Sequence, residues 1–321
     1  GPADRGGEVH GEHELRLHPL ERPIYDDLDR VDIHNEIDAT RLPFAGGKSW
    51  QDSYYFAFPF ALGSQNLKVL RGGQKWFDKL PDDYLPGARR DSVTTQNLIG
   101  MTDGRASVML AHRQAFHSVF PGYVKARPSP GNAPSDFPAL LTGKWPLPEA
   151  TLYSRAFRRG NQADTHDLGV TNLMTTEPGM DQQYVFDYAL NVSNGNFDDI
   201  AAWRLGSEFN LPLRVSYVTV PPVAAERSYF TVNQPNVEIV TVKQVADTTT
   251  HGEVSASPLN PRPSTVFVIR LQEFVGRATT AEVTTPVKVR SAAIMNQTED
   301  RVLESVSNLS PLIVKLKPYC T

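Results

Sequence analysis

Short apolar runs separated by turn-forming residues dominate the chain. The runs alternate apolar and polar positions or consist of β-branched and aromatic residues, and they lie at Val31–Ile37, Tyr54–Phe60, Ser107–Ala111, Tyr184–Leu190, Val215–Val220, Val237–Val245, Thr265–Leu271, Val287–Ala293 and Leu312–Leu316. The 25 prolines and 22 glycines are scattered and break the sequence between these runs. Such runs indicate β-strands, and many strands with few helical periods predict a mostly β chain of antiparallel sandwiches.

One segment follows helical spacing instead. Ile200, Trp203 and Phe209 recur at intervals close to the helical repeat. The carboxylates of Asp198–Asp199 can cap the start of this helix, and the segment Asn210–Pro212 ends it.

The chain divides into three parts by composition. Residues 1–20 form a polar leader, whose opening Gly1–Pro2 resembles the remnant of a cleaved tag. Pro221–Pro222 marks a softer boundary, after which the strands are cleaner and charged residues are sparser. We therefore expect a large sandwich at residues 21–220 and a smaller C-terminal sandwich at residues 221–321.

Composition and motifs exclude several functional classes. The formal net charge of −4 over 321 residues argues against a nucleic-acid partner, which requires a basic field. No apolar run approaches the roughly 20 residues that span a membrane, so we expect no membrane partner. Cys320 is the one cysteine, so no intrachain disulfide is expected, and neither a zinc signature nor a phosphate-binding glycine loop occurs. His10, His13 and His18 lie in the polar leader without a rigid frame, so no metal site is expected.

The entry to the run Tyr54–Phe60 combines groups that sugar binding uses. Trp50 and Tyr54 offer aromatic faces for stacking on a sugar ring, and Asp52 accepts hydrogen bonds from hydroxyl groups. In the alternative interpretation, Tyr54 belongs to the core and Trp50 lies on a hairpin rim.

Two further loops carry similar chemistry. The turn-rich loop at residues 82–91 holds Arg89 and Asp91, which could form a fixed guanidinium–carboxylate unit or grip a ligand carboxylate, and Gln96 follows this loop. The loop at residues 158–167 holds Arg158 and His166. The alternative for both is a solvated surface loop. These residues, with Trp50, Asp52 and Tyr54, are the predicted substrate-binding residues, and no residue of the chain is assigned a catalytic role.

Several segments also occur in a recognisable order along the chain. They are Ile24–Asp38, Tyr54–Phe60, Leu85–Ala88 with Asp91 and Gln96, Glu177–Gly179 with Phe186–Leu190, Phe209–Leu213, Val237–Lys243 and Val268–Gly276. In this order they resemble the C-terminal β-rich region of family 38 glycoside hydrolases, the retaining α-mannosidases. The resemblance covers nearly the whole chain. Two segments, Asn191–Asn194 and Asn97–Leu98, depart from the family pattern.

The resemblance implies a supersandwich of the galactose-mutarotase type followed by a smaller β-sandwich. In the family, the nucleophilic aspartate and the zinc ligands lie in an N-terminal α/β domain and the helical segment after it, and nothing in this sequence resembles either. The resemblance therefore implies a structural, carbohydrate-binding portion of an α-mannosidase-like glycoside hydrolase. Its partners would be the catalytic α/β domain of the same enzyme, which would hold the zinc, and a mannoside glycan.

Two alternatives from other classes stay open at this point. The chain could be a free-standing carbohydrate-binding module that relies on Trp50 and Tyr54. It could also be a lyase or a mutarotase-like enzyme on the same fold, in which His112, His166 and a carboxylate act as acid and base. Fold analogy does not separate these functions.

Overall fold

The structure is a computed structural model that describes residues 28–38, 52–63, 66–73, 76–80, 82–84, 92–115, 117–119, 150–159, 174–175, 183–219, 226–245 and 266–321. Contacts divide these residues into two units. Unit 1 lies within Gly1–Arg71, Lys79–Phe197 and Leu205–Leu211, and unit 2 lies within Gly72–Asp78, Asp198–Arg204 and Pro212–Thr321. The polar leader, with its three histidines, and the boundary at residues 220–221 fall outside the described residues.

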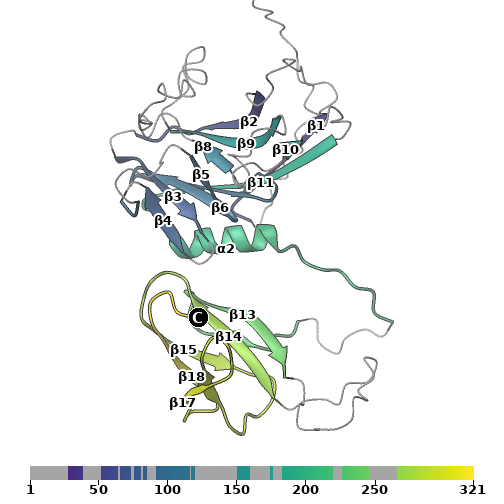
Figure 1. Ribbon diagram of the computed structural model, residues 1–321, viewed down its shortest axis with the longest axis vertical. Coiled ribbons are helices and arrows are strands. Elements are labelled where there is room, and N and C mark those ends of the chain that lie inside the picture. The colour runs from purple at the N-terminus through teal and green to yellow at the C-terminus, as the bar shows by residue number, and fades with distance from the viewer. Residues whose placement is uncertain are drawn as a thin grey trace, which may run out of the picture. The chain divides into compact units, whose positions relative to one another are not determined.

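Two β-sheets lie in unit 1, except that Gly72 of β3 and the first two residues of β4 belong to unit 2 (Figure 1). The six-stranded sheet has the order β1 (Val31–Asp38), β11 (Gln183–Asn194), β7 (Ala106–His112), β6 (Leu98–Thr102), β3 (Lys68–Gly72) and β4 (Phe77–Leu80). The five-stranded sheet has the order β10 (Met174–Thr175), β9 (Thr151–Arg159), β8 (His117–Val119) and β5 (Ser92–Thr94), and β2 (Asp52–Pro59) also pairs with β9. The described pairings are antiparallel except for the parallel contact of β10 with β9.

The core of unit 1 lies between these two sheets. The Tyr188 ring of β11 packs against Phe56 and Phe58 of β2, with ring centroids 5.7 and 5.0 Å apart. The Tyr188 hydroxyl donates a hydrogen bond of 3.0 Å to Ser154 Oγ on β9, which satisfies a polar atom inside the core. Ile99, Met101 and Leu110 of the first sheet and Leu152 of the second belong to the same buried cluster. The prediction of a mostly β, antiparallel sandwich is therefore confirmed.

The predicted helix is confirmed as α2 (Asp199–Asn210). Asp198 Oδ1 accepts hydrogen bonds of 2.9 and 3.1 Å from the backbone N–H groups of Ile200 and Ala201, as an N-cap residue does. In unit 1, the later part of α2 lies close to β6, because a Cβ atom added at Gly206 would meet Leu98 Cβ at 3.3 Å.

Unit 2 is built from short antiparallel sheets (Figure 1). They are β12 (Thr231–Val232) with β15 (Thr279–Thr284) and β18 (Leu312–Leu316), β13 (Val237–Gln244) with β14 (Phe267–Glu273), and β16 (Ala293–Met295) with β17 (Val302–Ser305). Its buried cluster consists of Val237, Leu271, Ala281, Val283 and Leu316.

A buried carboxylate organises the end of β14. Glu273 is fully buried, and its carboxylate accepts hydrogen bonds of 2.9 Å from Asn236 Nδ2 and from the backbone N–H groups of Val275, Gly276 and Tyr319. Burial alone would raise the pKa of Glu273, but these four donors outweigh it and hold the pKa below its ordinary value. The turn after β14 and the C-terminal turn therefore both donate backbone hydrogen bonds to the same carboxylate.

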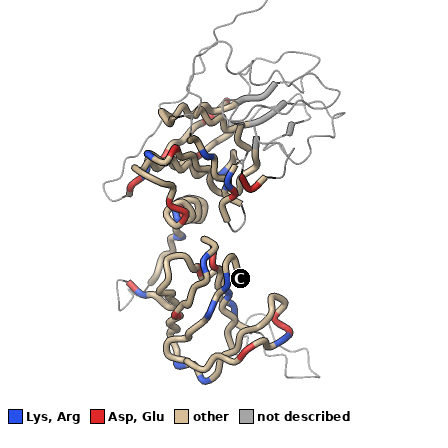
Figure 2. Tube along the Cα trace, turned by 90° about the vertical axis from the view of Figure 1, so that its left-hand side faces the viewer, with Lys and Arg blue, Asp and Glu red and all other residues tan. Residues whose placement is uncertain are grey.

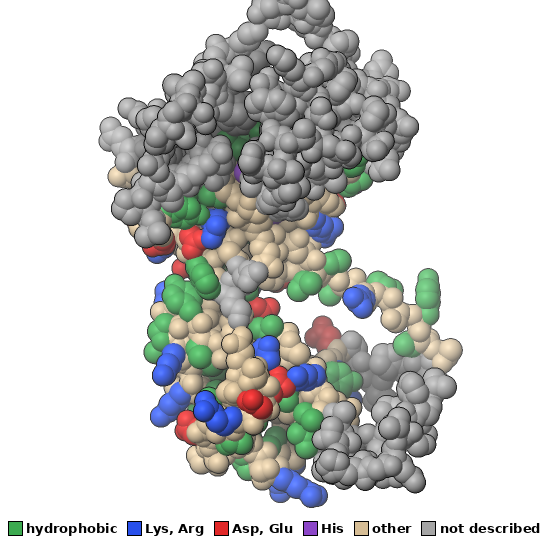
Figure 3. Space-filling view, viewed as in Figure 1, with side chains coloured by type: hydrophobic (Ala, Val, Ile, Leu, Met, Phe, Trp, Pro, Cys, Tyr) green, Lys and Arg blue, Asp and Glu red, His purple; other side chains and the backbone are tan. Residues whose placement is uncertain are grey.

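Two of the predicted strands are wrong. Val215–Val220 lacks a strand pairing over residues 215–219, and Val287–Ala293 is irregular up to the start of β16. Figure 3 shows apolar side chains standing out along the extended segment that follows α2, where Val215 and Tyr217 are 91% and 104% exposed. The alternation of Val215–Val220 is typical of a strand, but a strand forms only where a second backbone supplies hydrogen bonds.

Candidate functional site

The predicted residues Asp52, Tyr54 and Arg158 lie on neighbouring strands, although they are far apart in the sequence. In the pairing of β2 with β9, Ser53 lies opposite Arg158 and Tyr54 lies opposite Phe157. A register shift follows Tyr54, as in a β-bulge, a feature that is common next to functional sites. The antiparallel pairing thus gathers the backbones of the three predicted residues at one end of these strands.

Gln96 follows β5 at the same end of this sheet. Thr94 pairs with His117, and Ser118 pairs with Ser154 of β9, so the exit of β5 points toward the end of the sheet that carries Asp52 and Arg158. Gln96 is exposed in the turn between β5 and β6. This end of the five-stranded sheet therefore carries Asp52, Tyr54 and Arg158 on the paired strands β2 and β9, and Gln96 after β5, which is separated from β9 by β8.

The other predicted residues lie outside the described part of the chain. They are Trp50, Arg89, Asp91 and His166, and the side chains of Asp52, Tyr54 and Arg158 also lie outside it. Contact of this sheet end with a sugar stays a prediction.

The histidines near the exit of β7 are structural rather than accessible. His112 is 1% exposed, and its Nε2 atom lies 2.5 Å from Thr95 Oγ1. Burial lowers the pKa of His112 to about 4, so the ring is neutral at physiological pH. His117 is 2% exposed. A buried ring cannot exchange a proton with a bound substrate, which removes His112 from the acid–base role considered above.

A polar cluster that sequence reasoning missed lies on the other side of β1 from the core. His34 Nδ1 lies 2.7 Å from Asp187 Oδ1, and His34 Nε2 lies 3.2 Å from Glu36 Oε1. The hydrogen bond with Asp187, followed by the one with Glu36, raises the pKa of His34 above its ordinary value of 6.5. The His34 side chain is 41% exposed, so its proton can exchange with solvent.

Asp187 is held in place by two residues of the bend that follows β7. Its Oδ2 atom accepts a hydrogen bond of 3.3 Å from Gln114 Nε2 and lies 3.7 Å from Arg113 Nη1. Its backbone N–H donates to Gln114 Oε1 at 2.9 Å. The alternation along β1, in which Ile33 and Ile37 contact the core, predicts only that His34 faces the other way. Its partner on β11 depends on the long-range register.

Arg113 also fastens the end of α2. Its Nε and Nη2 atoms donate hydrogen bonds of 2.8 and 2.5 Å to the carbonyl oxygen of Phe209, and its guanidinium lies 4.3 Å from the centre of the Phe209 ring. A cation at the last carbonyls of a helix is favoured by the helix dipole. The arginine thus joins the Asp187 cluster to the helix end within unit 1.

The remaining features of the described residues concern metal-ligand groups, charge and membrane spans. Within the described ranges, no group of three or more His, Cys, Asp or Glu side chains is placed to hold a metal ion. Figure 2 shows acidic and basic residues interspersed along the described trace, in keeping with the formal charge of −4.

No described helix is long and apolar enough to cross a membrane.

Comparison with known proteins places the fold. No family model and no curated protein matches the sequence. The structure is similar to that of an α-mannosidase from Enterococcus faecalis V583, with a TM-score of 0.56 and 11% identity over 92% of this chain. It is also similar to a family 38 glycosyl hydrolase from Enterococcus faecalis, with a TM-score of 0.58, 11% identity and the same coverage. The chain spans only 27% and 28% of those two chains. The resemblance to family 38 enzymes is thereby confirmed at the level of the fold.

Proposed function

We propose that this chain is the C-terminal β-sandwich portion of an α-mannosidase-like glycoside hydrolase and does not itself carry the catalytic groups. The observation that supports this proposal is the coverage of the structural likeness. Nearly all of this chain corresponds to about a quarter of each Enterococcus faecalis chain. A β-sandwich of this kind supplies rigid strands on which end loops can be held.

The nucleophilic aspartate and the zinc ion are assigned to the remaining catalytic α/β portion, which is the proposed partner. Two features of the described residues support this division. First, the described residues contain no group of three or more His, Cys, Asp or Glu side chains placed to hold a metal ion. The buried histidine pair of β7 and β8 offers no accessible base, because His112 and His117 are 1% and 2% exposed.

The role proposed for this chain is to contact the glycan at the rim of the sugar site. The end of the five-stranded sheet supports this role, because the backbones of Asp52, Tyr54 and Arg158 lie there on paired strands and Gln96 follows β5 toward the same end. Carboxylate, amide and guanidinium groups recognise sugar hydroxyls, and aromatic rings stack on the sugar face. Trp50, Arg89, Asp91 and His166 complete the proposed contact set.

Hydrolysis of an aryl α-mannoside tests the assignment. The isolated chain should release no aryl alcohol above the rate of a sample without protein, whereas a polypeptide that also contains the catalytic portion should be active. A zinc chelator should abolish the activity of the longer polypeptide but leave the melting temperature of the isolated chain unchanged. Enzyme-like hydrolysis by the isolated chain would show that the assignment is wrong.

A free-standing carbohydrate-binding module is a second candidate, favoured by the exposed rings of Trp76 and Tyr319 in unit 2, whose centroids are 6.2 Å apart. The two candidates differ in one result. A free-standing module has no catalytic portion in its natural polypeptide, so the upstream reading frame of the gene separates them.

A further inference from the structure

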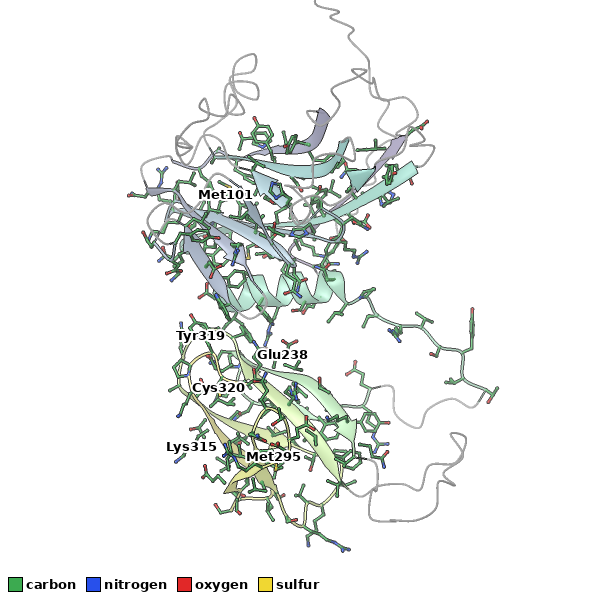
Figure 4. All side chains as sticks on the ribbon, in the orientation of Figure 1. Met101, Glu238, Met295, Lys315, Tyr319 and Cys320 are labelled. Carbon is green, nitrogen blue, oxygen red and sulfur yellow. The ribbon has the colours of Figure 1, made fainter. Side chains whose placement is uncertain are left out.

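Two aromatic rings of unit 2 are exposed side by side. Trp76 and Tyr319 are 44% and 49% exposed, their ring centroids are 6.2 Å apart, and their planes meet at 65°. Trp76 lies immediately before β4, and Tyr319 lies in the C-terminal turn, labelled in Figure 4. Large aromatic rings are more often buried, so an exposed pair in contact is a candidate for binding.

The Trp76 side of the pair is fixed by its turn. The backbone N–H of Gly73 donates a hydrogen bond of 2.9 Å to the carbonyl oxygen of Trp76. The indole Nε1–H donates to Asp78 Oδ1 at 2.6 Å, which fixes the direction of the ring. A carboxylate thus lies beside the exposed indole.

The Tyr319 side is held in a strained conformation. Tyr319 has a φ of 54°, in the left-handed region that residues other than glycine rarely occupy. Its backbone N–H donates to Glu273 Oε2 at 2.9 Å, and the N–H of Cys320 donates to the carbonyl oxygen of Lys317 at 3.1 Å. The buried Glu273 carboxylate therefore stabilises a turn that a tyrosine would not adopt by itself.

The Tyr319 ring also requires a glycine beneath it. A Cβ atom at Gly276 would lie 2.5 Å from Cζ and 2.6 Å from the hydroxyl oxygen of Tyr319. Gly276 has a φ of +85°, which glycine adopts readily. The position therefore requires glycine both for its backbone conformation and for the space that the Tyr319 ring occupies. Backbone strain at an exposed residue is characteristic of a functional constraint.

We propose that the Trp76–Tyr319 pair binds a pyranose ring of a neutral glycan, through residues other than those at the end of the five-stranded sheet. The proposal deepens the proposed function and rests on it for the class of ligand. The flat face of an indole stacks on the C–H groups of a sugar, and a neighbouring carboxylate such as that of Asp78 accepts hydrogen bonds from sugar hydroxyl groups.

The size of the pair favours a sugar over a protein. A stable protein interface buries about 800 Å² on each partner and is centred on several large side chains. The pair offers two rings flanked by polar groups, because Asp78 and the Glu273-bound turn adjoin it. One or two sugar residues fit a surface of this extent.

Titration of the isolated 321-residue chain with methyl α-mannopyranoside and with yeast mannan, by calorimetry and tryptophan fluorescence, tests the site. We expect saturable binding of mannan that Trp76→Ala weakens at least about tenfold. Tyr319→Ala should weaken it similarly, and Tyr319→Phe should preserve it. Tyr229→Ala is the matched control, because Tyr229 is 56% exposed in the same unit and its ring lies 4.7 Å from the Arg227 guanidinium. It should bind as the parent chain does.

Circular dichroism of each variant checks that the fold is kept. Trp76→Ala decides the question even if Tyr319→Ala disturbs its turn, because Trp76 is exposed. Absence of binding at about 10 mM sugar, or equal binding by the parent and Trp76→Ala, overturns the proposal. A third outcome also overturns the proposal: the parent chain binds no glycan, and Trp76→Ala associates more weakly with the catalytic portion. The pair would then be a contact with a protein. Failure here leaves the hydrolysis test intact, because that test needs no binding by the isolated chain.

Discussion

The imidazole of His34 and the carboxylate of Asp187 face each other across β1 and β11, with Nδ1 and Oδ1 2.7 Å apart and the two residues in register. The second ring nitrogen of His34, Nε2, lies 3.2 Å from Glu36 Oε1. The other carboxylate oxygen of Asp187, Oδ2, lies 3.7 Å from Arg113 Nη1. The histidine thus has two acidic neighbours, of which one is shared with a cation.

The first prediction concerns pH. Because the folded-state pKa of His34 is raised above 6.5, protonated His34 contributes stability below about pH 6.5, and this contribution is lost as the pH rises through the folded-state pKa. His34→Gln should therefore lower the melting temperature more at about pH 5.5 than at about pH 8.5. The group is partly exposed, so we expect an effect below about 1 kcal/mol. An equal effect at both pH values would contradict the prediction, and an NMR titration of His34 measures its pKa directly.

The second prediction concerns His112 and has the opposite sign. Burial lowers its folded-state pKa to about 4, so only the unfolded chain takes up the proton between about pH 6.5 and pH 4. Stability is present above that window and falls through it, by up to about 3 kcal/mol. His112→Gln, which can keep a hydrogen bond to Thr95, should lose less stability on acidification. Thermal unfolding in a His34→Gln background isolates the effect, and identical pH dependence of the two proteins would refute it.

The third prediction concerns the buried carboxylate of unit 2. Glu273→Gln replaces one acceptor oxygen with an N–H group that faces backbone donors, so we expect unfolding to become easier by about 3 kcal/mol. Urea denaturation measures the change. Glu304→Gln on exposed β17 is the control and should change stability by less than about 0.5 kcal/mol. A loss no larger than that of the control would mean that the four donors find other partners.

The fourth prediction compares two glycines with similar backbones. Gly195 and Gly276 have φ values of +88° and +85°, but an added Cβ meets nothing within 4 Å at Gly195 and meets the Tyr319 ring at Gly276. Gly195→Ala should cost about 1 kcal/mol from conformation alone. Gly276→Ala should cost at least about 2 kcal/mol, because the ring must also move. Thermal unfolding of both variants provides the test, and equal losses would show that the ring moves without resistance.

β1 shows what the sequence alone can predict about a strand. Its alternation correctly predicts a strand with Ile33 and Ile37 in the core. The same alternation at Val215–Val220 predicts a strand that the structure lacks, because the described residues of that segment have no pairing partner. The predicted sugar-contact residues were chosen for their chemistry, and the position of Asp52, Gln96 and Arg158 toward the same end of one sheet became visible only through the strand register.

Local patterns were sufficient to determine the mostly β class, the capped helix α2 and the inward face of β1, because these features depend on residues close together in the chain. Tertiary structure decided which strands are neighbours, and so brought His34 to Asp187, Tyr319 to Trp76 and the C-terminal turn to Glu273. The physical reason is that the partners of a strand or a buried charge come from distant segments, which the folded chain alone brings together.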